Sequence, residues 1–324
     1  MRATPSRSAS RTLRVALGVT IGAALATATA CSTSSPAKTA PAGASGAGGG
    51  SSKVIQAVAA ENFWGSIATQ LGGDHVKVTS VITNPDTDPH SYEPTAADGR
   101  TVAGAEYVIS NGIGYDAWSD KLLAANPASG RTALKVGDLL GKKEGDNPHQ
   151  WYSAESVTKV IDRITADYKK IDPADAAYFD SRKQTFTTQT LAKYNQLEAD
   201  IKARYADTPI GASESIVTPL AESTGLKMLT PETFLDAESE GTDPTAADKA
   251  AIDQQISGKQ IKIYVYNTQN SNPDVVAQVN AAKAQGIPVA QVTETLAPVN
   301  ATFQDWQTQQ LQGIADALKQ ATGK

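Results

Sequence analysis

The strongest constraint on the fold is a central stretch, residues 172–205, which has no glycine and no proline apart from Pro173. A proline at the first helical position costs no hydrogen bond, and apolar side chains recur along the stretch at helical spacing. It therefore predicts one helix of about 45 Å, at 1.5 Å per residue. Because strand and helix patterns lie on both sides of it, we interpret it as a rigid connection between two lobes; a long surface helix of a single domain is the alternative.

The patterns on either side predict an α/β fold, in which each lobe is a parallel β-sheet wrapped by helices. Strands are expected at residues 54–59, 76–82, 107–110, 209–211, 261–266 and 289–292. Helices are expected at residues 64–71, 95–103, 117–125, 154–171, 216–225, 245–257, 273–285 and 302–321. Strand and helix in alternation are typical of parallel sheets, whose ligands lie beyond the carboxyl ends of the strands. We expect an N-terminal lobe at 53–171, a connecting helix at 172–206 and a C-terminal lobe at 207–324.

The N-terminus has the pattern of a secretory signal. Residues 1–30 carry four arginines and no acid, with an apolar stretch too short to span a membrane. Small residues directly before Cys31, the only cysteine, resemble a lipoprotein cleavage box, although Ala28 stands where that box usually has leucine. We expect Cys31 to be lipidated; the alternative is an ordinary cleavage site. Residues 31–52 are rich in Ser, Ala, Gly and Pro, which predicts a flexible tether holding the protein on the extracytoplasmic face of the membrane.

Charge and cysteine content limit the possible functions. Removing residues 1–30 changes the formal charge from −5 to −9, which argues against a nucleic-acid partner and against a polybasic membrane surface. A lipidated Cys31 leaves no thiol as a nucleophile or a metal ligand. Phosphate-binding glycine loops of the GxGxxG or Walker type are absent from the sequence, and so is the HExxH motif of metalloproteases.

Two of the three histidines share an unusual setting, because each follows a proline. They are His90 and His149, in the tripeptides DPH and NPH. Proline fixes φ near −65°, so both imidazoles lie on stiffened loops, and imidazole is the commonest neutral nitrogen ligand of transition metals. Either could instead be an ordinary loop histidine. His75 belongs to a turn that leads into a strand, which indicates a structural role.

Neighbouring residues could complete a metal site around these histidines. Glu93, three residues after His90, is a candidate acceptor for the ring N–H that faces away from a metal. Trp151 could shield His149 from solvent. Two imidazoles do not fill a metal's coordination shell, and the remaining ligands must then be oxygens. Glu214 and Glu294 each follow a predicted strand of the second lobe and are candidates, although either could be a solvated surface acid.

These residues resemble a known family. DPHSYEPT at residues 88–95, the NPH turn, the long central helix and VTET at residues 292–295 are similar to substrate-binding proteins of bacterial ABC importers for manganese and zinc. The resemblance covers nearly all of residues 53–321, and DPHxYEPT is its most specific part. It implies that His90 and His149 are the first two metal ligands.

The resemblance also assigns the other candidate positions. Glu214 falls where members have a histidine or a glutamate, and Glu294 falls where they usually have an aspartate, so one ligand arm is longer by a methylene. Asn62, in the segment ENFWG, matches a pocket-lining position of one branch of the family. The His-rich loop of many zinc-importing members is absent from this sequence.

The implied function is that of an extracytoplasmic solute-binding protein. It would capture a divalent ion, Mn²⁺ or Zn²⁺, between two lobes and deliver it, as a lipid-anchored monomer, to a membrane permease. The missing third histidine favours manganese slightly, whereas raw affinity favours zinc. We weigh two alternatives, a lipid-anchored metallohydrolase and a metal-binding surface adhesin. A hydrolase would need an open metal position and a nearby general base, and no spare histidine supplies one, so we expect the protein not to be an enzyme.

Overall fold

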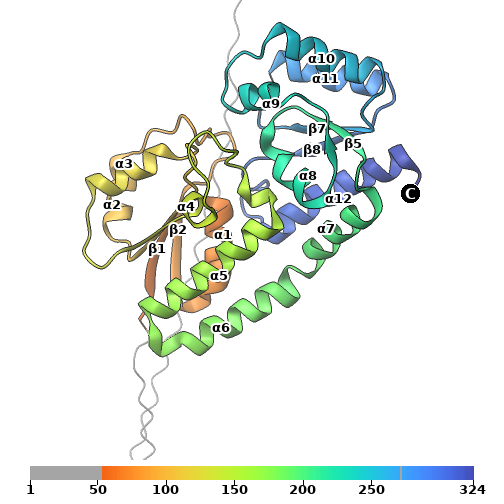
Figure 1. Ribbon diagram of the computed structural model, residues 1–324. Coiled ribbons are helices and arrows are strands. Elements are labelled where there is room, and N and C mark those ends of the chain that lie inside the picture. Colours follow the sequence, from red (N-terminus) through yellow and green to blue (C-terminus); the bar gives the residue numbers. More distant parts are fainter. Residues whose placement is uncertain (1–52, 271) are drawn as a thin grey trace, which may run out of the picture. The chain divides into compact units, whose positions relative to one another are not determined.

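A computed structural model describes residues 53–270 and 272–324 of the chain. These residues belong to one compact unit, residues 51–324 (Figure 1). The predictions of a signal peptide, a lipidated Cys31 and a tether concern residues 1–52, which lie outside the described residues. In the described part of the chain, no helix is long and apolar enough to cross a membrane.

The first sheet has four parallel strands in the order β2-β1-β3-β4. Its strands are β1 (Ile55–Glu61), β2 (Val76–Ile82), β3 (Tyr107–Ser110) and β4 (Thr132–Lys135). Its helices are α1 (Asn62–Gly72), α2 (Ala96–Ala103), α3 (Ala117–Ala125), α4 (Val136–Leu140) and α5 (Ala154–Ile171). The central strand β1 is almost entirely buried, because both faces of a parallel sheet are covered by helices.

The second sheet repeats this arrangement, with parallel strands in the order β6-β5-β7-β8. Its strands are β5 (Pro209–Ala212), β6 (Lys227–Met228), β7 (Ile263–Asn267) and β8 (Val289–Val292). Its helices are α8 (Thr218–Thr224), α9 (Glu232–Ser239), α10 (Ala246–Ser257), α11 (Pro273–Ala284) and α12 (Phe303–Thr322). The predicted α/β class with two parallel sheets wrapped by helices is confirmed.

The connecting segment is helical but not uniformly so. A 3-10 turn at Pro173–Asp175 is followed by α6 (Ala176–Thr185), a π-helical turn at Phe186–Thr190 and α7 (Ala192–Tyr205). Figure 1 shows this run leading from the first sheet to the second. The hydroxyls of Thr187 and Thr188 donate to carbonyls one turn earlier, and such bonds compete with the regular α-helical pattern.

The hydrophobic core does not stop at the boundary between the two sheets. The largest cluster of buried apolar residues includes Trp64 and Trp151 of the first half together with Ile210 and Val265 of the second. Helix α12 begins against α1, where the Phe303 N–H donates to the Ser66 hydroxyl at 2.9 Å. The two sheets are therefore joined by packing as well as by the connecting helix.

Candidate metal-binding site

The His90 loop follows β2 and is held by Asp88. The Asp88 carboxylate accepts from the His90 N–H at 2.9 Å and from the Ser91 hydroxyl at 2.8 Å, and the Trp118 indole N–H donates to the Pro89 carbonyl at 3.1 Å. The His90 side chain is exposed and lies edge-on to Tyr115, with 4.9 Å between ring centroids. The loop is thus fixed while the imidazole remains free to bind.

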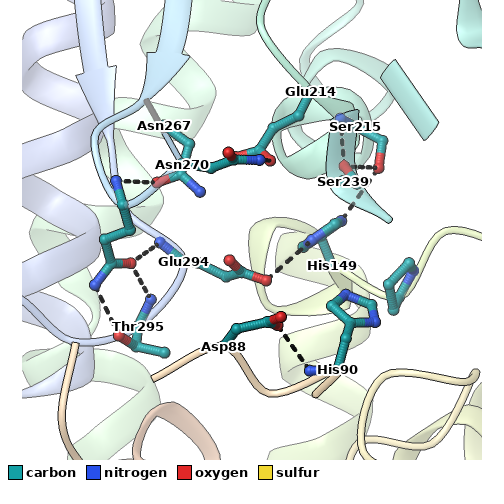
Figure 2. Close-up of polar contacts among 12 residues, drawn as sticks. Asp88, His90, His149, Glu214, Ser215, Ser239, Asn267, Asn270, Glu294 and Thr295 are labelled. Atoms are coloured by element: carbon teal, nitrogen blue, oxygen red, sulfur yellow. Dashed lines mark hydrogen bonds and ion pairs between the residues drawn. The ribbon is translucent and has the colours of Figure 1, made fainter. Parts of the chain in front are cut away.

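His149 is buried, with 1 % of its surface exposed. The Asn147 side-chain oxygen accepts from the His149 N–H at 2.9 Å and lies 3.0 Å from its Nδ1, while the Asn147 amide donates to the Ser215 carbonyl at 2.8 Å. The hydrogen bond to Ser215 identifies which side-chain atom of Asn147 is its nitrogen, so the atom facing Nδ1 of His149 is the oxygen. Because an oxygen can only accept, Nδ1 of His149 must carry the ring proton. Nε2 therefore presents an electron pair, and it lies 3.6 Å from Oε1 of Glu294 (Figure 2).

The protonation of this pair follows from burial and charge. Burial lowers the pKa of His149, against the opposing effect of Glu294, so the imidazole is neutral near pH 7. Burial raises the pKa of Glu294, but hydrogen bonding to a protonated His149 and the positive charges of protonated His149 and His90 lower it overall. When Nε2 carries no proton, the imidazole and the carboxylate face each other as two electron-pair donors, which is an arrangement that a shared cation would stabilise.

Glu214 follows β5 and is also buried, with 3 % of its surface exposed. Its Oε2 accepts from the Asn270 amide at 3.0 Å, whereas its Oε1 has no hydrogen-bond partner among the described residues. Burial, and next the negative charge of Glu294, raise the pKa of Glu214 to about 8. This carboxyl is therefore mostly protonated at neutral pH while no cation lies beside it.

The candidate ligands line one cavity without closing around a point. His90, Glu214 and Glu294 face a cavity of about 190 Å³, and His149 reaches it through Glu294. Within residues 53–270 and 272–324, no group of three or more His, Cys, Asp or Glu side chains is close enough to hold a metal ion. Three of the four predicted ligands thus line a common cavity, and the fourth, His149, contacts one of them, Glu294, at 3.6 Å.

The other predicted pocket residues have different outcomes. Asn62 is buried, and its side-chain oxygen accepts from the Leu296 N–H at 3.3 Å, two residues beyond Glu294. Trp151 is fully buried, stacks on Phe63 with centroids 4.0 Å apart and lies edge-on to the His149 ring. Glu93 is exposed, and the hydrogen bonds of the described residues include none from it to His90. Asp88 supports the His90 loop in a different way, because its short side chain accepts from the backbone N–H two residues on and not from the ring.

The segment after β7 contributes two residues to the site, Gln269 and Asn270, that were not predicted from the sequence. Gln269 accepts from the N–H groups of Glu294 and Thr295 at 2.6 and 3.0 Å, and its amide donates to the Pro85 carbonyl of the first half at 2.8 Å. Asn270 holds Glu214. Both residues follow a strand's carboxyl end, as Glu214 and Glu294 do, but amide side chains are common at such positions, so position alone does not single them out.

Replacing Gln269 by alanine is expected to lower metal affinity about 10- to 100-fold, the usual cost of losing a partner that orients a ligand. The backbone N–H groups of Glu294 and Thr295 would lose their acceptor, and the Glu294 carboxylate would no longer be fixed. Calorimetric titration of the purified protein measures this change. Gln291→Ala is the matched control, because among the described residues the exposed side chain of Gln291 bonds only to the Tyr266 hydroxyl. Equal losses of metal affinity in both variants would contradict the role assigned to Gln269.

Comparisons with known proteins identify the family of this chain. The sequence model of the family described as "ZnuA: Zinc-uptake complex component A periplasmic" matches residues 57–317. The chain is 24 % identical to the manganese-binding lipoprotein MntA of Bacillus subtilis over 253 residues, which cover 75 % of this chain and 81 % of the relative. It is 26 % identical to the zinc-binding lipoprotein AdcA of Streptococcus pneumoniae, over 63 % of this chain and 43 % of that protein.

Solved structures share the fold. A manganese-bound periplasmic metal-binding protein from Candidatus Liberibacter asiaticus superposes with a TM-score of 0.67 at 22 % identity, covering 82 % of this chain and 99 % of that one. The manganese complex of the solute-binding protein FpvC from Pseudomonas aeruginosa gives a TM-score of 0.66 at 18 % identity, with 82 % and 98 % coverage.

Proposed function

Because the chain belongs to the ZnuA family of metal-binding solute-binding proteins of ABC importers, we propose that it captures a divalent transition metal ion and delivers it to a membrane permease. The proposed ligands are His90, His149, Glu214 and Glu294. The observation that carries this proposal is the neutral His149 imidazole facing the Glu294 carboxylate at 3.6 Å. Two ligands on one tetrahedral ion lie about 3.3 Å apart, given metal–ligand distances of about 2.0–2.1 Å.

Binding requires a small local closure. His90 is exposed on its loop and Glu214 is fixed by Asn270, so the imidazole of His90 has to move towards the other three ligands. Two neutral imidazoles and two carboxylates give a neutral site with a divalent cation. The helical connection and the shared core keep the two sheets together, so the closure involves the His90 loop or a loop of the second half rather than a wide opening of lobes.

The proposed cargo is Mn²⁺ or Zn²⁺. Relatives named for manganese and for zinc both match this chain, and the oxygen-rich ligand set with no third histidine favours manganese slightly. The proposed role is binding and transport, not catalysis. His75, the remaining histidine, is paired with Asp175 at 2.6 Å and stacked on Tyr178, so a hydrolase could not use it as a base without breaking that pair. No observation here favours an adhesin.

The proposed setting is the extracytoplasmic face of the cell membrane. Cys31 would carry the lipid, residues 1–30 would be removed and residues 31–52 would tether a monomer beside its permease, with no role for nucleic acid. Two relatives that are named as lipoproteins, MntA and AdcA, support the anchor. The proposed division remains an N-terminal lobe at 53–171, a connection at 172–206 and a C-terminal lobe at 207–324.

The test is calorimetric titration of the metal-free mature protein with Mn²⁺ and Zn²⁺ in separate experiments. At least one of them should bind with a Kd in the nanomolar range, about −12 kcal/mol. An absence of binding tighter than micromolar for both ions would overturn the proposal. Metal analysis of protein purified from its native host then identifies the physiological cargo.

A further inference from the structure

Glu238, near the end of α9, is a buried acid that lines the same cavity. It is not one of the four proposed ligands. Only 3 % of its surface is exposed, and it lines the 190 Å³ cavity together with Glu214. Its Oε1 has no hydrogen-bond partner within the described residues. A buried carboxylate oxygen without a partner is costly, so its retention beside a cation site needs a physical reason.

Glu238 and Glu214 are held in the same way by one segment. The Asn272 amide donates to Oε2 of Glu238 at 2.5 Å, and the Asn270 amide donates to Oε2 of Glu214 at 3.0 Å. The Asn270 amide also donates to the Glu238 backbone carbonyl at 2.9 Å, which links the two acids directly. Each carboxylate therefore has one oxygen that accepts from an asparagine and one buried oxygen for which residues 53–270 and 272–324 supply no hydrogen-bond partner.

The lining of this cavity is rich in acidic side chains. Six carboxylates line it: Asp86, Asp88, Glu214, Glu238, Glu240 and Glu294. Among the described residues that line it there is one imidazole and neither lysine nor arginine. One divalent ion held by the four proposed ligands would pair with Glu214 and Glu294 only. Glu238 would not be paired with it, and the nearby Lys249 already forms an ion pair with Asp274.

We propose that Glu238 and Glu214 form a second, outer position for a divalent cation, with Glu214 bridging it to the proposed inner site. The free Oε1 atoms of the two glutamates are its protein ligands, and water completes the shell. All of these donors are oxygens, so the outer position suits Mn²⁺ better than Zn²⁺. With few protein ligands it binds weakly, with a Kd of about 10⁻⁴ to 10⁻³ M, as in extracellular oxygen-ligand sites. The proposal rests on the proposed function, because Glu214 is shared with the inner site.

The test counts bound Mn²⁺ by electron paramagnetic resonance, which detects the free aqueous ion, during titration of the mature protein to millimolar Mn²⁺. The wild-type protein is expected to bind a second ion at least 100-fold more weakly than the first. Glu238→Gln keeps the acceptor for Asn272 but removes the charge. It should bind one ion only, with the affinity of the tight event changed less than threefold.

Two further variants make the result decisive. Glu232 lies on the same helix, is exposed and does not line the cavity. The Glu232→Gln variant should therefore still bind two ions. Glu238→Asp retracts the carboxylate by one methylene and should weaken the second event at least fivefold, which tests the proposal even if Glu238→Gln folds poorly. A wild-type protein that binds a single ion, or a folded Glu238→Gln variant that still binds two, would overturn the outer position. Loss of the tight event alone would instead count against the proposed function.

Discussion

Replacing His90 by alanine is expected to reduce the affinity of the tight metal-binding event more than 100-fold and to leave the folded protein otherwise intact. Loss of a group that only orients a ligand costs about 10- to 100-fold, and a direct ligand should cost more. The imidazole is exposed, and the loop is held through the His90 backbone and Asp88. Exposed substitutions usually change stability by less than about 0.5 kcal/mol, so the Tm of the metal-free protein should move by no more than about 2 °C.

The matched comparison is His75→Ala, for which we expect the reverse. His75 pairs with Asp175 at 2.6 Å and stacks on Tyr178 with centroids 3.9 Å apart, where the first sheet meets α6. Its loss should cost about 1–3 kcal/mol of unfolding free energy, because it removes a partly buried bond and a ring contact. Metal affinity should be unchanged. Calorimetry and thermal unfolding of both variants measure the two quantities, and a similar loss of affinity in both would show that the site is misplaced.

Metal affinity is expected to fall about tenfold for each pH unit as the pH is lowered from 8 to 6. Burial and the charge of Glu294 raise the pKa of Glu214 to about 8, so a proton occupies this carboxyl at neutral pH and must leave when a cation binds. His149 and Glu294 contribute little at neutral pH and above. The lowered pKa of each already leaves an unprotonated ring and a charged carboxylate. Protons therefore compete at Glu214, and the competition weakens as the pH approaches 8.

Titrations at pH 6, 7 and 8 measure this slope, and buffers of different ionisation enthalpy count the protons released. Close to one proton per ion is expected at pH 7. Glu214→Gln should bind more weakly at every pH but with a flatter profile, since its side chain does not titrate. A steep profile in Glu214→Gln would show that another group, and not Glu214, exchanges the proton.

Elements with a clear apolar pattern could be predicted from the sequence, and elements without one could not. The two parallel sheets follow from apolar runs such as residues 54–59 and 261–266. Strand β6 has two residues and β4 has four, and pairing with a neighbouring strand defines both rather than a pattern of their own. The π-helical turn at Phe186–Thr190 depends on threonine hydroxyls that bond back to the helix, a choice that apolar spacing does not reveal.

The same distinction holds for the site. His90 and His149 could be identified because each of them follows a proline. Glu214 and Glu294 could be identified because ligands of parallel sheets lie beyond the carboxyl ends of the strands. Gln269, Asn270 and Asn147 could not, because amide side chains after a strand are typical of any loop. Their importance depends on which carbonyl or carboxylate lies opposite each of them in the folded protein. The expectation for Glu93 rested on sequence spacing alone, and its side chain is exposed.

The hydrophobic cluster that runs through both halves has a consequence for how a permease could tell a loaded protein from an empty one. Trp151 stacks on Phe63 within a cluster that continues to Val265, so drawing the halves apart would bring large apolar surfaces into water. A large change in overall shape between the loaded and the empty state would therefore cost much free energy. The permease would have to recognise a local difference. This difference would be a change in charge and loop position at the mouth of the cavity, involving only a few residues.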